Sequence, residues 1–175
     1  IDCILLALGI LEKLISTGQT DLSGFNISDA QGIVGFLKIF ADTCHHGKEE
    51  GILFPAYEQH GVPNEGGPIG VMLAEHVEGR SHIKTMSQAL DQDPADRKSI
   101  SQAARNYIDL LRAHIQKEND VLYPFGDSFL SEDEQVSLFK QFEAHEEQVI
   151  GKGKHEELHA QLEKWSSNYL GGHHH

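Results

Sequence analysis

Apolar residues recur every three or four positions along most of the chain, which is the spacing of one face of an amphipathic helix. The first such run spans residues 1 to about 16, and its apolar positions are Ile4, Leu5, Leu8, Leu11, Leu14 and Ile15. Thr17-Gly18 is expected to end it. Because the run opens directly in an apolar pattern without an N-cap, we interpret it as the remainder of a longer helix.

Turn and cap residues divide the rest of the chain into further helical runs, expected at about 28–61, 68–90, 93–124 and 131–169. Ser28 and Gln31 have the spacing of a capping box, and so do Ser131 and Glu134. Pro55 falls late in its run and should kink or loosen the last turn. The glycines around Lys152 are expected to interrupt the last run.

Four long helical runs joined by short loops favour an all-α fold, an up-and-down four-helix bundle with an additional C-terminal helix. We expect a single domain over residues 1–170, with about 131–170 as the added segment. Its apolar residues could cover the bundle or form the face of a homodimer: Phe139, Phe142, Val149, Leu158, Leu162 and Trp165. Residues 171–175 end in three histidines and look like a purification-tag remnant, so they are set aside.

The charge balance narrows the classes of partner. There are 27 acidic and 14 basic residues, a formal net charge of −13, which disfavours binding to nucleic acid or to an anionic membrane. No apolar run is long enough to span a membrane, and no signal peptide is visible. The two cysteines form no disulfide framework and fit a reducing compartment, so a cytoplasmic location is predicted.

One phrase occurs twice, first over residues 45–55 and again over 114–124. The matched pairs, in register, are His45 with His114, Glu49 with Glu118, Leu53 with Leu122, Phe54 with Tyr123 and Pro55 with Pro124. Each copy places a histidine and a glutamate four residues apart, hence on one face of a helix. Two such faces turned toward each other could hold a pair of metal ions.

A helical wheel at about 100° per residue tests this interpretation. Five polar residues point toward the predicted core from three helices: His45, Glu49, His76, His114 and Glu118. His46 and Glu50 point nearly the opposite way, so we expect them to face solvent or to support the ligands from outside. The remaining histidines are expected at the surface: His60, His82, His145, His155 and His159.

Buried carboxylates and imidazoles need a physical reason. An unpaired carboxylate in the core is so costly that it would take up a proton, whereas a metal ion removes that cost. Imidazole with carboxylate suits iron, zinc or manganese. A single core histidine is more often structural, and a single His/Glu pair is usually a surface pair. The matched duplicate, however, favours a metal site.

These motifs resemble the hemerythrin-like, or HHE cation-binding, family from Ile1 to about Pro124. The matching positions are His45-His46, Glu49-Glu50, Leu53-Phe54-Pro55, Glu75-His76, His114-Ile115 and Glu118. The resemblance implies a four-helix bundle enclosing two non-heme iron ions. By position it implies that His45, His76 and His114 are terminal ligands. It also implies that Glu49 and Glu118 bridge the two ions.

Two departures from the family pattern bear on function. The family normally has another ligand histidine on the first helix, and that position falls before Ile1. Oxygen-carrying members have a second histidine four residues after the one that matches His76, and here Arg80 stands there, on the inward side of the wheel. A guanidinium cannot ligate a metal, but it could pair with a metal-bound carboxylate or an anionic ligand. This argues against simple reversible oxygen carriage.

The sequence therefore predicts a cytoplasmic diiron protein that binds or senses oxygen, nitric oxide or peroxide, or that handles iron. One alternative is a diiron enzyme with peroxidase or ferroxidase-type activity, so whether the chain is an enzyme stays open. Another is a bundle in which zinc or another divalent metal is only structural. The chain could also be one module of a larger regulator.

Overall fold

The computed structural model describes residues 2–16 and 25–171, and within these ranges every regular element is helical. The predicted helix end at Thr17-Gly18 and residues 172–175 of the expected tag lie outside the described residues. No helix in the described ranges combines the length and the apolar character needed to cross a membrane. The all-α prediction is confirmed.

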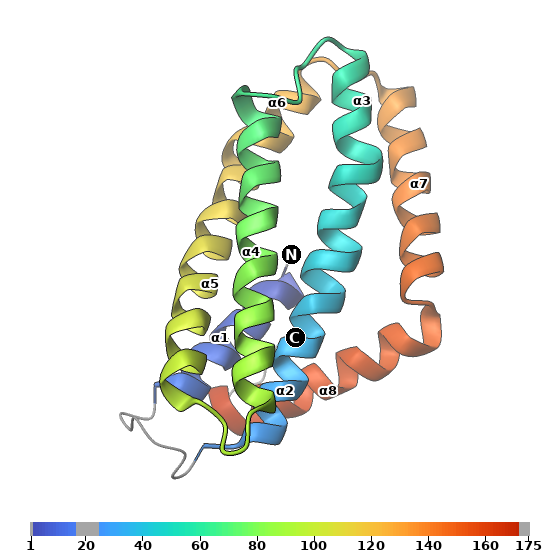
Figure 1. The fold of residues 1–175 in the computed structure, drawn as a ribbon. Coiled ribbons are helices and arrows are strands. Elements are labelled where there is room, and N and C mark those ends of the chain that lie inside the picture. Colours follow the sequence, from blue (N-terminus) through green and yellow to red (C-terminus); the bar gives the residue numbers. More distant parts are fainter. Residues whose placement is uncertain (1, 17–24, 172–175) are drawn as a thin grey trace.

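Four helical runs form the bundle (Figure 1). The first is α1 (Asp2–Ile15) and the third is α4 (Gly67–Asp91). The second is continuous from α2 (Ile27–Leu37) through η1 (Lys38–His46) and η2 (Glu49–Leu53) to α3 (Phe54–Gln59). The fourth is continuous from α5 (Arg97–Lys117) through η3 (Glu118–Leu122) to α6 (Tyr123–Asp127). The segments η1, η2 and η3 are π-helical, with backbone hydrogen bonds that span five residues.

The two copies of the sequence repeat adopt the same backbone. The N–H of Phe54 bonds to the carbonyl of Glu49, and the N–H of Tyr123 bonds to that of Glu118. Each π-turn therefore lies immediately before a proline. Proline has no N–H, and its ring would strike the carbonyl four residues earlier in an α-helix. A widened turn ahead of the proline relieves that conflict, which is the loosening expected at Pro55.

The helix caps partly differ from the prediction. The second run begins with Asn26 as N-cap, whose side chain accepts from the N–H of Asp29 at 2.9 Å, so the prediction of a cap at Ser28 is wrong. The fourth run begins at Asp96, which accepts from the N–H of Ser99 at 3.1 Å, rather than at residue 93. A side-chain acceptor for a free helix N–H decides both positions. The capping box at residues 131 and 134 is confirmed.

Two apolar clusters fill the interior. The larger joins α1, α2, α8 and the residues of α4 and α5 from about 83 to 115. The smaller lies at the other end of the bundle, and its buried members are Leu53, Phe54, Tyr57, Ile69, Met72, Leu122, Leu130 and Leu138. Five buried polar residues of the three long runs lie where the two clusters meet, namely His46, Glu49, His76, His114 and Glu118. The bundle core is therefore interrupted by one polar layer.

The C-terminal segment is two helices, α7 (Glu132–Val149) and α8 (Lys152–Leu170), separated at Gly151 as the sequence predicted. In Figure 1, α7 stands beside α3, and α8 crosses near α1 and α2. Leu158, Leu162 and Trp165 are buried, so α8 covers the bundle. A side chain at Gly32 would place its Cβ 2.5 Å from the ring of Trp165, so glycine is required for this contact.

Candidate metal centre

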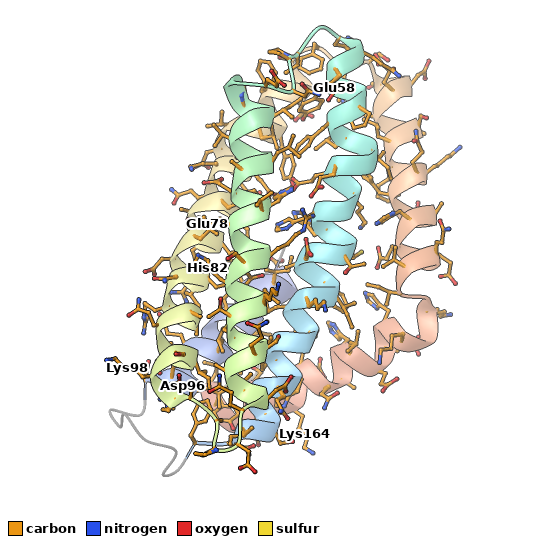
Figure 2. All side chains as sticks on the ribbon, in the orientation of Figure 1. Glu58, Glu78, His82, Asp96, Lys98 and Lys164 are labelled. Atoms are coloured by element: carbon orange, nitrogen blue, oxygen red, sulfur yellow. The ribbon has the colours of Figure 1, made fainter. Side chains whose placement is uncertain are left out.

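Five buried polar side chains from three helical runs meet in the polar layer. They are His46, Glu49, His76, His114 and Glu118, and one ligand atom from each lies within 4.8 Å of all the others. None is more than 3% exposed. Most other charged side chains of the long helices are exposed or partly exposed, and Glu58, Glu78 and Lys164 stand on the outer surface (Figure 2). The core thus contains a group whose chemistry differs from that of its surroundings.

The two carboxylates divide this layer into two halves. In what we call the closed half, Glu49 Oε1 lies 3.0 Å from His76 Nε2, and Glu118 Oε1 lies 2.6 Å from His114 Nε2. In the open half, Glu118 Oε2 lies 2.9 Å from His45 Nε2, and Glu49 Oε2 lies 4.0 Å from it. Each carboxylate therefore offers one oxygen to each half, which is what a bridge between two ions requires.

Unsatisfied atoms in the closed half favour a cation there. Among the described residues, His114 Nε2, Glu118 Oε1 and His46 Nδ1 are buried without a hydrogen-bond partner. The first two are close together, yet their geometry does not make a hydrogen bond. Buried polar atoms are almost always satisfied, so such a group needs an explanation. A metal ion would engage the lone pairs of His114 Nε2 and Glu118 Oε1, whereas His46 Nδ1 lies 3.7 Å from Asp42. The residues of the closed half therefore fit a metal ion.

The ionisation of the group follows from burial and from its neighbours. Burial alone would raise the pKa of Glu118, but the imidazoles of His114 and His45 hold it well below its usual range. Burial alone would lower the pKa of His114, but the carboxylates of Glu118 and Glu49 raise it to about 10. Without a metal, His114 is therefore protonated at neutral pH. Binding a metal at its Nε2 would release that proton.

A second set of carboxylates orients the two deeply buried histidines. His76 donates from Nδ1 to Glu50 at 2.8 Å, and His114 donates from Nδ1 to Glu75 at 2.9 Å. Each carboxylate is in turn paired with a cation: Arg80 lies 2.5 Å from Glu50, and Lys117 lies 2.7 Å from Glu75. With Nδ1 occupied by a carboxylate, Nε2 of each ring is directed into the cluster, as is common for metal-ligating histidines.

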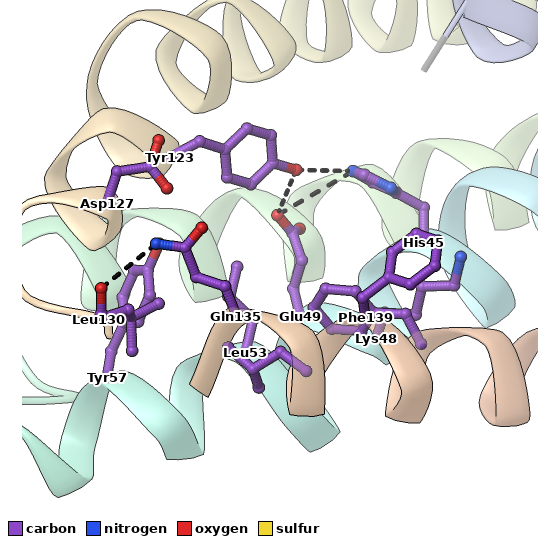
Figure 3. A pocket seen from close by; sticks show the side chains of 12 residues that line it. His45, Lys48, Glu49, Leu53, Tyr57, Tyr123, Asp127, Leu130, Gln135 and Phe139 are labelled. Atoms are coloured by element: carbon purple, nitrogen blue, oxygen red, sulfur yellow. Dashed lines mark hydrogen bonds and ion pairs between the residues drawn. The ribbon is translucent and has the colours of Figure 1, made fainter. Parts of the chain in front are cut away.

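The open half borders a cavity of about 400 Å³ between the bundle and α7. Figure 3 shows His45, Glu49 and Tyr123 together on one wall, with Leu53 and Phe139 on the others. The Tyr123 hydroxyl lies 2.5 Å from Glu118 Oε2 and 3.3 Å from Glu49 Oε2. The two halves therefore differ in access, because the closed half is fully enclosed by protein whereas the open half adjoins space.

The structure brings four of the five predicted residues into the cluster, namely Glu49, His76, His114 and Glu118. His45 lies at its edge, with a side chain 18% exposed. The prediction that His46 points away from the core is wrong: it is 3% exposed, and its ring stacks on that of His76 with centroids 3.8 Å apart. The π-helical turns of η1 advance by less than 100° per residue, which turns His46 inward.

The predictions for residues around the cluster were partly confirmed and partly wrong. Glu50 supports His76, which is one of the two roles expected for it. The inward placement of Arg80 is wrong, because it is 41% exposed and pairs with Asp42 and Glu50 rather than with a cluster carboxylate. Sequence reasoning missed Tyr123, although its register with Phe54 in the repeat was the available signal. The surface histidines are confirmed as not buried.

Comparison with known proteins agrees with this fold and cluster. The hemerythrin HHE cation-binding domain model matches residues 5–125, and the chain therefore belongs to that family. An iron-sulfur cluster repair protein YtfE from Enterobacter sp. (strain 638) is 36% identical over 102 residues, which are 54% of this chain and 46% of that protein. A probable iron-sulfur cluster repair protein from Haemophilus influenzae is 34% identical over 101 residues, 53% and 45%. The aligned part thus spans less than half of these relatives. No solved structure matches the chain.

Proposed function

We propose that this chain is a non-heme diiron protein that binds a small ligand, namely oxygen, nitric oxide or peroxide, at the open half of its metal centre. The observation that carries the proposal is the pair of buried carboxylates, Glu49 and Glu118, each with one oxygen in each half. When bound, iron would supply the redox change and the vacant coordination positions that such ligands require.

In this proposal the protein residues have separate tasks. Glu49, Glu118, His45, His76 and His114 would hold the metal ions, with His46 as a further candidate. Glu50 and Glu75 hold His76 and His114 in the correct tautomer through their Nδ1 protons. Because His114 must lose a proton to bind metal, affinity for iron should weaken as the pH falls. A cytoplasmic location stays part of the proposal.

A second candidate function is iron handling during iron-sulfur cluster repair. The printed names of the relatives favour it, since those proteins are called iron-sulfur cluster repair proteins. The two candidates share the metal centre and differ in the fate of the iron. A ligand-binding protein retains its iron through a cycle of ligand binding and release, whereas a repair protein loses iron to an acceptor.

Metal analysis with a visible spectrum tests the shared part of the proposal. After anaerobic loading with ferrous iron we expect about two iron ions per chain. Glu118→Ala should abolish loading, because both halves lose a carboxylate oxygen. His159→Ala is the control, since His159 is 49% exposed on α8, and it should load normally. Zinc in place of iron, or equal loading of both variants, would contradict the diiron assignment.

The fate of the iron then separates the candidates. Loaded protein is exposed to nitric oxide and returned to an inert atmosphere, and its iron content is measured before and after. Unchanged content with a reversible spectral change supports ligand binding. Transfer of iron to an apo ferredoxin mixed with the loaded protein supports iron handling.

A further inference from the structure

The two copies of the repeat differ at their aromatic residue. Phe54 in the first copy is 2% exposed, and its ring lies nearly parallel to that of His76, with centroids 6.0 Å apart. Tyr123 occupies the same register position in the second copy and has a hydroxyl group. The apolar ring therefore seals the closed half, and the polar ring belongs to the open half.

The Tyr123 hydroxyl faces three atoms of the open half at once. It lies 2.5 Å from Glu118 Oε2, 3.3 Å from Glu49 Oε2 and 3.4 Å from His45 Nε2. A phenol has one proton to donate, so it can bond to only one of these acceptors at a time. A cation held by the two Oε2 atoms would take over their lone pairs. The O–H would then be free to bond to whatever else occupies the open half.

The cavity of about 400 Å³ provides the space for such a ligand. Most of its wall is apolar, including Leu53, Leu138 and Phe142. In Figure 3 the Gln135 amide is turned toward the Leu130 carbonyl, to which it donates at 3.2 Å. Lys48, on the same wall, is 3.4 Å from Glu146. Of the possible donors that line the cavity, the Tyr123 hydroxyl and His45 Nε2 reach the cluster. His45 is itself a candidate metal ligand, so the hydroxyl is the donor left for a small ligand, and a hydrogen bond is stronger in apolar surroundings.

We propose that Tyr123 is a ligand-binding residue of the open half. Its O–H donates a hydrogen bond to the acceptor atom of a small ligand that reaches the metal centre through the cavity beside α7. The ligand class is small molecules or anions with a lone pair on the atom next to the metal, such as nitric oxide, azide or peroxide. The inference rests on the proposed diiron function and adds the group that discriminates among ligands.

Tyr123→Phe in the full chain tests the inference with azide as the probe. Iron content and the affinity for azide, from the visible absorption of the loaded protein, are both measured. We expect normal iron content and about tenfold weaker azide binding, since one hydrogen bond to a charged acceptor is lost. Tyr57→Phe is the matched control: Tyr57 lines the same cavity, but its hydroxyl donates to the Leu122 carbonyl at 3.1 Å. Its azide affinity should stay within about twofold.

The other outcomes overturn the inference in distinguishable ways. Equal azide affinity in Tyr123→Phe and the unchanged protein means that the hydroxyl contributes nothing to the ligand. Loss of iron in Tyr123→Phe means that the hydroxyl holds the metal instead. An equal loss of affinity in both tyrosine variants assigns the effect to cavity shape. If the unchanged protein takes up no iron, the proposed function fails together with the inference.

Discussion

The two copies of the repeat share one backbone conformation, but their corresponding residues face opposite halves of the candidate metal centre. The histidine of the second copy, His114, faces the closed half, whereas His45 of the first copy faces the open half. The aromatic residues are arranged the other way round, with Phe54 of the first copy on the closed half and Tyr123 of the second copy on the open half. The two helical runs that carry the copies point the same way in Figure 1. A local twofold relation between parallel helices produces this exchange.

The difference between the copies lies in side chains rather than in the main chain. Both π-turns run from a glutamate to a leucine and precede a proline. Such turns recur at functional sites because they shift the direction of neighbouring side chains. The shared turns direct one oxygen of each glutamate toward each half. The different residues at the aromatic position then leave one half enclosed and the other beside the cavity. The symmetric placement of the two carboxylates and the unequal access to the two halves are thus set by different residues.

The largest expected effect on the difference between the two copies comes from changing the adjacent histidines of the first copy, His45 and His46. His45→Ala should remove the imidazole of the open half and lower iron content from about two ions to about one per chain. His46→Ala should retain about two ions, because His46 Nδ1 is directed toward Asp42 at 3.7 Å and not toward the oxygens of Glu49 and Glu118. Metal analysis after anaerobic loading measures both. A larger loss in His46→Ala would make His46 the ligand and break the exchange between copies.

That test addresses what the sequence could not decide. Helical periodicity predicted the bundle, the helix break at Gly151 and four of the cluster residues, because apolar spacing and repeat register survive in any helix. The wheel failed at His46 and Arg80, because it assumes a uniform 100° advance and extended side chains. A π-helical stretch changes the advance, and a long arginine side chain can pair at the surface with its stem along the helix. Neither effect is visible in residue spacing.

Glu75→Gln tests whether the two carboxylates that support the histidines of the closed half are equivalent. The Glu75 side chain is 16% exposed and bonds to His114, whereas Glu50 is 31% exposed and shares Arg80 with Asp42. Loss of the more buried carboxylate should weaken iron binding about 10- to 100-fold, and Glu50→Gln should have the smaller effect. Competition with a chelator at fixed pH measures the affinity.

Glu78→Gln is the control for that experiment, because Glu78 lies on α4 but is exposed (Figure 2). Its iron affinity should match that of the unchanged protein. If Glu75→Gln behaves like the control, the hydrogen bond to His114 does not tune the site.

The smallest expected effect concerns the residues just after each copy, here called the tails. Tyr57 follows the first copy and Gly126 follows the second, at the same register position. A Cβ at Gly126 would lie 2.0 Å from the Tyr57 hydroxyl, which is held by its bond to the Leu122 carbonyl. Gly126→Ala should therefore destabilise the protein by about 1–3 kcal/mol through overpacking, measured by thermal unfolding. Gly153→Ala, with nothing within 4 Å of its Cβ, should be within about 0.5 kcal/mol of the unchanged protein.

A double variant decides whether that cost arises from the contact between the tails. In a Tyr57→Leu background the ring and hydroxyl are gone, so Gly126→Ala should cost much less than it does alone, giving a coupling of about 1 kcal/mol or more. An undiminished cost would place the strain in α6 itself. The large residue of one copy would then have no bearing on the small residue of the other. A measured coupling would instead show that the large Tyr57 requires the small Gly126 opposite it, because a side chain at Gly126 would overlap the Tyr57 hydroxyl.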